Sequence, residues 1–146
     1  MIKVIIKKFE PKYRDDLIFM ILEAKDALGR VPGLNEDLLD IQKNYFDNGD
    51  MFWIAVDDND RVVGSIGYNS FENSSEINLH RLFVKPNMKH NGLGTKLLHT
   101  AEEYARSKGK TAIYVHLGRP KNQWYESYRT RPHRIKIYAT ACGYAK

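Results

Sequence analysis

The chain has 146 residues, of which 42% are hydrophobic and 28% are charged, and its formal net charge is +5. These values predict one globular domain over residues 1–146. The single cysteine, Cys142, excludes an internal disulfide framework and a cysteine-based zinc cluster. The apolar run near the start has only three residues between lysines, too few for a signal peptide or a membrane span. We therefore expect a cytoplasmic protein that has no membrane partner.

The two halves of the chain differ in charge. Residues 1–74 contain 9 Lys/Arg and 14 Asp/Glu, a balance of −5, whereas residues 75–146 contain 14 Lys/Arg and 4 Asp/Glu, a balance of +10. This asymmetry favours an anionic ligand on the second half and a cationic one on the first, although basic residues also decorate ordinary solvated surfaces.

Hydrophobic periodicity and turn residues divide the chain into strands and helices. In chain order we expect a strand at Ile2–Phe9, a helix at Asp15–Leu28, a helix at Asn35–Phe46 with Asn35 as its N-cap, strands at Met51–Val56, Arg61–Phe71 and Ile77–Val84, a helix at Gly92–Ser107, a strand at Thr111–Leu117, and weaker signals for a helix at Asn122–Tyr128 and a strand at Ile135–Tyr138. This order indicates a mixed α/β (α+β) layer structure. The unit from Ile77 to Leu117 is expected to be a right-handed crossover between parallel strands.

The stretch between the strand ending at Val84 and the helix beginning at Gly92 carries the most specific chemistry. A basic loop leads to Gly92-Leu93-Gly94 at the start of a helix, where backbone amides lack intrahelical partners and the peptide dipoles add positive charge. Glycine allows an anion to approach these amides, so the pattern suits a pyrophosphate. Neither the P-loop nor the dinucleotide fingerprint fits, because their glycine spacings differ.

The segment Lys89-His90-Asn91-Gly92-Leu93-Gly94-Thr95 resembles the acyl-CoA pyrophosphate loop of the GNAT superfamily of N-acetyltransferases, whose pattern is Arg/Gln-x-x-Gly-x-Gly/Ala. The flanking strand and helix are also similar to the family's, over about residues 76–118. Lys89 stands where Arg or Gln is usual, so the charge is kept and the planar fork is lost. The resemblance implies a GNAT-like central mixed sheet flanked by helices.

The resemblance also implies direct acetyl transfer from acetyl-CoA to an amine of a small molecule or peptide, with no metal. Backbone groups of the preceding strand would pair with the pantetheine arm, and the loop amides would hold the pyrophosphate. The residues implied for coenzyme binding are Leu82, Phe83, Val84, Lys89, His90, Asn91, Gly92, Leu93, Gly94, Thr95 and Asn122.

Direct transfer needs a group that takes a proton from the amine and one that gives a proton to the leaving thiolate. Glu76 and His80 are the candidate bases, and two-residue alternation predicts that His80 shares a face with Leu82 and Val84. Both can equally be ordinary strand residues. The family draws its acid from a tyrosine in the next helix, for which Tyr128 is favoured over Tyr125 and Tyr138.

Residues 129–146 depart from the family pattern, since about ten residues remain where two further strands are usual. An incomplete C-terminal sheet edge near Ile135–Tyr138 is therefore expected, and such an edge favours a homodimer. The acidic half would receive a cationic amine, with Asp26, Glu36, Asp37 and Asp40 as contributors or as solvated surface charges.

Two other functions stay open from the sequence. A CoA-binding sensor without transferase activity would explain the missing acid motif. A nucleic-acid-binding module is supported by the basic stretch 119–134 with its interleaved aromatic residues, but no known nucleic-acid motif is present.

Overall fold

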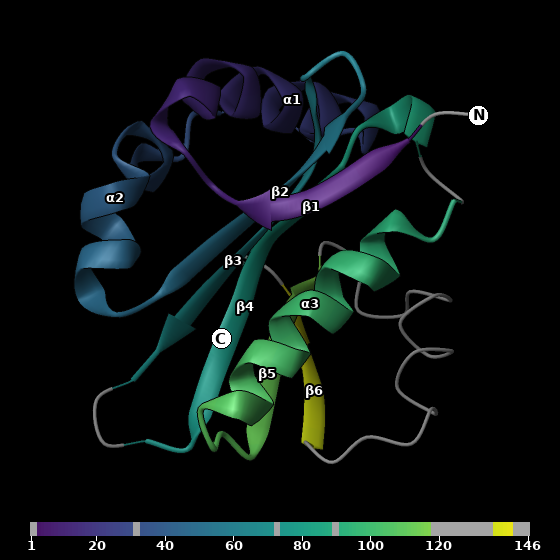
Figure 1. Ribbon diagram of the computed structural model, residues 1–146. Coiled ribbons are helices and arrows are strands. Elements are labelled where there is room, and N and C mark those ends of the chain that lie inside the picture. Colours follow the sequence, from purple (N-terminus) through teal and green to yellow (C-terminus); the bar gives the residue numbers. More distant parts are fainter. Residues whose placement is uncertain (1–2, 31–32, 72–73, 89–90, 118–135, 142–146) are drawn as a thin grey trace.

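The computed structural model describes residues 3–30, 33–71, 74–88, 91–117 and 136–141. Figure 1 shows a twisted sheet with α1 and α2 on one side and α3 on the other. The elements are β1 (Val4–Lys8), η1 (Pro11–Tyr13), α1 (Arg14–Ala27), η2 (Glu36–Leu39), α2 (Ile41–Asn44), η3 (Phe46–Asn48), β2 (Met51–Asp57), β3 (Val62–Ser70), β4 (Glu76–Val84), η4 (Pro86–Met88), α3 (Leu93–Ser107), β5 (Ala112–Leu117) and β6 (Lys136–Ala141). The expected mixed α+β architecture is confirmed.

The sheet has six described strands in the order β1-β2-β3-β4-β5-β6. The first four strands pair with their neighbours in antiparallel fashion. A tight turn joins β2 to β3, and in it the Asp57 carboxylate accepts hydrogen bonds from the backbone amides of Asn59 and Arg61. β4 and β5 are parallel and are connected through α3. The predicted parallel strand–helix–strand unit is therefore confirmed.

Two hydrophobic clusters cover the two faces of the sheet. The α3 face includes Leu97 and Leu98, both fully buried, and the α1 face includes Leu17 and Ile21. The central strands contribute to both clusters alternately, as Trp53 on the α3 side and Ile54 on the α1 side illustrate. Apolar residues at steps of three and four thus bury one face of each helix, as the sequence predicts.

The predicted helix from Asn35 to Phe46 is wrong as a single element. Asp40, at φ −146° and ψ 81°, interrupts it, and the segment forms three short turns, η2, α2 and η3. The Asp40 carboxylate accepts the amide of Lys43 at 3.0 Å and so begins α2, since aspartate favours helix starts over helix interiors. Asn35 precedes η2, but its side chain makes no capping hydrogen bond.

The end of the chain adds a strand close to the predicted position. β6 spans Lys136–Ala141, against a prediction of Ile135–Tyr138, and pairs with β5 in parallel. Among the described strands, β6 and β1 form the two edges of the sheet. The predicted helix 122–128 lies outside the described residues, and the homodimer stays a prediction.

Candidate functional site

Strands β4 and β5 separate halfway along β4. Their parallel pairing runs from Glu76 opposite Ala112 to Leu79 opposite Val115. β4 nevertheless continues to Val84, still paired with β3. Among the described residues, no strand pairs with the β5-side edge of Leu82–Val84. Another extended chain can pair with such an edge as an added strand.

A β-bulge interrupts β4 at the same point. Between the pairs Gly67–His80 and Ser65–Phe83, β3 has one residue whereas β4 has two, Arg81 and Leu82. Arg81 has φ +55°, in the left-handed region that costs a residue with a side chain about 1 kcal/mol. The buried Ser65 hydroxyl donates to the Arg81 carbonyl oxygen at 2.7 Å, which helps to hold this conformation.

The bulge corrects the predicted orientation of His80. Leu82 and Val84 pack against the α3-side cluster, but the His80 ring packs at a tilt of 53° against Tyr45, which belongs to the α1-side cluster. The extra residue in β4 shifts the two-residue alternation by one position, because each inserted residue moves the following side chains to the opposite face. His80 therefore faces the segment between α1 and β2 instead of sharing a face with Leu82 and Val84.

The first turn of α3 is open. Gly92 is the N-cap residue with φ +77°, and no side chain among the described residues caps the helix there. A Cβ atom placed on Gly92 would meet no described atom within 4 Å, and one on Gly94 would meet only Val84 Cγ2, at 3.8 Å. No described side chain therefore fills the space beside Gly92, and the turn lies beside the end of β4.

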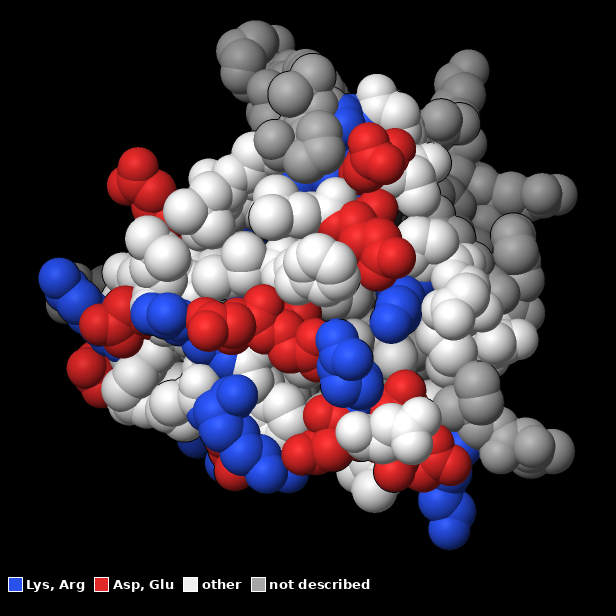
Figure 2. All heavy atoms as spheres, turned by 90° about the horizontal axis from the view of Figure 1, so that it is seen from above, with Lys and Arg blue, Asp and Glu red and all other residues white. Residues whose placement is uncertain are grey.

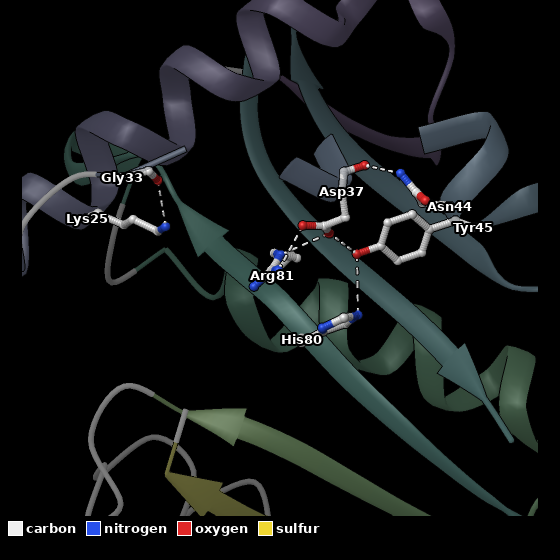
Figure 3. A network of polar contacts seen from close by, with 7 residues as sticks. All are labelled: Lys25, Gly33, Asp37, Asn44, Tyr45, His80 and Arg81. Atoms are coloured by element: carbon white, nitrogen blue, oxygen red, sulfur yellow. Dashed lines mark hydrogen bonds and ion pairs between the residues drawn. The ribbon is translucent and has the colours of Figure 1, made fainter. Parts of the chain in front are cut away.

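A polar network joins the bulge to the segment between α1 and β2 (Figure 3). Arg81 donates two hydrogen bonds to the Asp37 carboxylate, from Nε at 3.1 Å and from Nη2 at 2.9 Å. The Tyr45 hydroxyl donates to Asp37 Oδ2 at 2.5 Å and lies 3.3 Å from His80 Nε2. Asn44 binds the Asp37 carbonyl oxygen at 3.2 Å. The network therefore connects η2, α2 and β4.

The ionisation states of Asp37 and Tyr45 follow from these contacts. Burial alone would raise the pKa of Asp37, but the hydrogen bonds from Arg81 and Tyr45 outweigh it, so the pKa lies below its ordinary value. Burial, together with the neighbouring Asp37 carboxylate, raises the pKa of Tyr45 far above its ordinary value. Asp37 is therefore an anion and Tyr45 a neutral phenol at neutral pH.

The remaining predicted residues are only partly brought together. Glu76 is exposed at the paired start of β4, four residues before His80, where its amide binds Ser74 Oγ at 3.0 Å. Asn91 is exposed, and Leu93 and Thr95 lie in the first turn of α3. Lys89, His90, Asn122 and Tyr128 lie outside the described residues.

Charges of both signs are interleaved around α1. Figure 2 shows the molecule from above, with Lys/Arg and Asp/Glu alternating on this face and neither forming a continuous patch among the coloured residues. Several carboxylates of the first half are thus paired with basic side chains of the same half. The ion pairs in this region are Lys7–Glu10, Lys12–Asp60, Arg14–Asp15 and Arg61–Asp16.

Metal-binding clusters and membrane-spanning helices are both absent from the described part of the chain. No group of three or more His, Cys, Asp or Glu side chains there has an arrangement that could hold a metal ion. No helix in those ranges is both long and apolar enough to cross a membrane.

The comparison with protein families identifies the class to which this fold and site belong. The acetyltransferase (GNAT) family model matches residues 18–128, and the chain belongs to this family. The predicted family is therefore confirmed.

Curated relatives carry N-acetyltransferase names. The chain is 31% identical over 109 residues to a probable N-acetyltransferase camello of Xenopus tropicalis, covering 71% of this chain and 49% of that protein. It is 26% identical over 115 residues to probable N-acetyltransferase 14 of the same species, covering 79% and 54%. The chain spans about half the length of these curated relatives.

Solved structures agree on the fold. An acetyltransferase from Streptococcus agalactiae has a TM-score of 0.74 at 24% identity, covering 86% of this chain and 79% of that one. Glucosamine-6-phosphate N-acetyltransferase from Arabidopsis thaliana has a TM-score of 0.69 at 12% identity, covering 92% and 95%. At these identities the similarity concerns the fold.

Sequence reasoning identifies the polar network only in part. It predicts no role for Arg81 and places Tyr45 only on a helix face, whereas it names Asp37 as a contributor to a cationic-amine site or as a solvated surface charge. All three depend on contacts across 35 to 44 positions of the chain, which no local pattern reports. The proximity of Arg81 to the candidate base His80 in the sequence is the one available signal.

Proposed function

We propose that this chain, as one acyl-CoA N-acyltransferase domain, transfers an acetyl group from acetyl-CoA directly to a primary amine of a small molecule or a peptide. One observation carries the proposal. The described pairing of β4 with β5 stops at Leu79, and the end of β4 at Leu82–Val84 lies beside the first turn of α3, with Val84 Cγ2 3.8 Å from the position of a Cβ on Gly94. A strand edge and a helix start in contact are what an extended arm with a pyrophosphate at one end requires.

The pyrophosphate and the pantetheine arm of the coenzyme would bind to different parts of the protein. The amides of the first α3 turn, at Leu93, Gly94 and Thr95, would bind the pyrophosphate, with Lys89, His90, Asn91 and Asn122 contributing as the family resemblance implies. The β4 backbone at Leu82–Val84 would pair with the pantetheine arm. A β4 amide near the bulge would donate to the thioester oxygen as negative charge develops on it.

Acetyl transfer by this route needs no covalent enzyme intermediate. The amine nitrogen attacks the thioester carbon, the C–N bond forms and the C–S bond breaks. The thiolate takes one proton, for which Tyr128 is the proposed donor, and each acetylated ammonium releases one net proton to solvent. His80 is the proposed base, because it faces the segment from η2 to α2 that the acceptor would approach, whereas Glu76 lies at the paired end of β4.

The direct test measures binding and transfer separately. Isothermal titration with acetyl-CoA should show binding at micromolar to low millimolar ligand, and an amine panel should yield free thiol in the presence of the protein. No binding at millimolar acetyl-CoA would refute the proposal. Binding without thiol release from any amine would favour a CoA sensor. A salt-sensitive nucleic-acid gel shift without coenzyme binding would favour a nucleic-acid-binding module.

A further inference from the structure

A buried hydroxyl group contacts the backbone of the β4 bulge. Ser65 on β3 is fully buried, and its pairing partner on β4 is Phe83, the residue that follows the bulge. The Ser65 hydroxyl donates to the carbonyl oxygen of Arg81 at 2.7 Å. The hydroxyl must be the donor in this contact, because a backbone carbonyl can only accept. Ser65 therefore connects β3 with the first residue of the bulge.

Arg81 has a backbone conformation that a residue with a side chain rarely adopts. Its φ of +55° lies in the left-handed region, and glycine is the usual residue at the first position of a bulge with this geometry. A residue with a Cβ keeps such a conformation only where its surroundings impose it. Ser65 binds the carbonyl oxygen of Arg81, and the Asp37 carboxylate accepts from its guanidinium (Figure 3). Two elements that are distant in the sequence thus contact opposite ends of this residue.

The carbonyl group of Arg81 and the N–H group of Leu82 belong to one peptide unit. This unit is planar, and no peptide bond among the described residues is cis. A contact that holds the carbonyl group therefore also fixes the plane in which the Leu82 N–H group lies. Leu82 begins the segment Leu82–Val84, whose β5-side edge pairs with no described strand and whose end lies beside the first turn of α3. Ser65 is thereby coupled through one rigid unit to the backbone that is proposed to bind the acyl end of the coenzyme.

We propose that Ser65 is a positioning residue for acetyl transfer, whose hydroxyl holds the Arg81–Leu82 peptide unit so that the β4 backbone is oriented toward the thioester oxygen before the reaction begins. This inference rests on the proposed function, in which a β4 amide near the bulge donates to that oxygen. A hydrogen-bond donor stabilises developing negative charge most effectively when its orientation is fixed in advance. Ser65 itself loses no proton and touches no substrate.

Small residues are needed on β3 beside the bulge. Gly67 lies opposite His80, and a Cβ on Gly67 would come within 3.3 Å of the His80 carbonyl oxygen. Ser65, two positions earlier, is also small, but it differs from alanine by the hydroxyl oxygen that binds Arg81. Ser65→Ala therefore removes this hydrogen bond with little change in packing.

The contact can be tested without substrate. A residue with positive φ gives a strong nuclear Overhauser effect between its own amide and α protons, because the two protons lie close together. In the full chain labelled with ¹⁵N and ¹³C, this signal of Arg81 should be strong in the native protein and weaker by about 2-fold or more in Ser65→Ala. A native Arg81 without the signal overturns the inference, whether or not any variant folds. A signal of equal strength in Ser65→Ala overturns the role of the hydroxyl.

The kinetic test compares two serine-to-alanine variants on the same strand. Ser65→Ala should lower kcat about 10-fold to 100-fold and change the KM for acetyl-CoA less than about 3-fold, since the donor is displaced while the pyrophosphate turn is untouched. Ser70 is the matched control, because its hydroxyl donates to Asp50 at 2.8 Å and it pairs with Ile77, at the other end of β4.

The control separates positioning from stability. Ser65→Ala and Ser70→Ala each lose one side-chain hydrogen bond, so both should lower the melting temperature by a few degrees. Only Ser65→Ala should lower kcat, and the kcat of Ser70→Ala should stay within about 2-fold of the native value. Equal kcat values in the two variants overturn the positioning role.

The failure of this inference and that of the proposed function are distinguishable. A native protein that binds no acetyl-CoA or acetylates no amine refutes the transferase proposal and, with it, the catalytic part of this inference. A native protein that acetylates amines, together with a Ser65→Ala variant of native kcat, refutes the positioning role alone. The Arg81 signal still supports or overturns the contact between Ser65 and the bulge, because its measurement uses neither acetyl-CoA nor an amine.

Discussion

Replacing Gly92 by Glu tests whether the first turn of α3 binds the coenzyme pyrophosphate. Gly92 has φ +77°, and no described atom lies within 4 Å of the place that a Cβ would occupy, so a side chain fits there without a clash. The left-handed conformation costs a residue with a Cβ about 1 kcal/mol. We therefore expect the melting temperature of Gly92→Glu to fall by about 2–4 °C.

The loss of binding should be much larger than the loss of stability. A carboxylate within about 5 Å of a bound pyrophosphate repels each negative charge by about 1–3 kcal/mol, depending on the local dielectric constant. A total of about 3 kcal/mol corresponds to an affinity for acetyl-CoA that is roughly 100-fold weaker. Isothermal titration of the native and variant proteins at one fixed salt concentration measures this ratio.

Gly109 supplies a matched control at the other end of the same helix. It has φ +76° and equally open surroundings, and it follows the last turn of α3. Gly109→Glu should lose at least as much stability, since a carboxylate near a helix C-terminus is also repelled by the helix dipole. Its affinity for acetyl-CoA should stay within about 3-fold of the native value, because screening by salt weakens a charge remote from the pyrophosphate. Equal affinities of Gly92→Glu and Gly109→Glu would refute a pyrophosphate site at the start of α3.

Two further predictions concern stability. Gly64→Ala should lower the free energy of unfolding in urea by about 1–3 kcal/mol, because its Cβ would lie 2.9 Å from Leu97 Cδ1 in the core; a loss below about 0.5 kcal/mol would contradict this packing. Asp37→Asn should lower the free energy of unfolding by about 2 kcal/mol at pH 7, since the substitution weakens the contacts with Arg81 and Tyr45. The pKa of Asp37 is lowered in the folded protein, so this stabilisation is complete above the unfolded pKa of about 4 and is lost as the pH falls through the folded pKa. If the difference in the free energy of unfolding between the native protein and Asp37→Asn stays constant from about pH 7 to about pH 2, the Asp37 carboxylate is not the stabilising anion proposed here.

The regular elements could be predicted because their signals are local. The apolar stripe of α3 recurs at steps of three and four, and the residues from Leu93 to Ala105 that form it are buried. The glycines at positions 92 and 94 stand between a strand and a helix, which fixed both the family resemblance and the position of the candidate pyrophosphate turn. The interrupted segment after Asn35 was harder, since Asp40 begins a new helical turn where the apolar spacing alone favours a continuous helix.

What the sequence by itself determined is the family, the order of the strands and helices, and the turn between Val84 and Leu97 that is proposed to bind acetyl-CoA. These depend on neighbouring residues and on the periods of helices and strands. Only the tertiary structure decided that His80 faces Tyr45. One additional residue in β4 reverses the alternation of side chains, and this bulge is stabilised by Asp37 and Ser65, which are distant in the sequence. A local pattern can assign a residue to a strand, but the pairing with neighbouring strands decides which face it occupies.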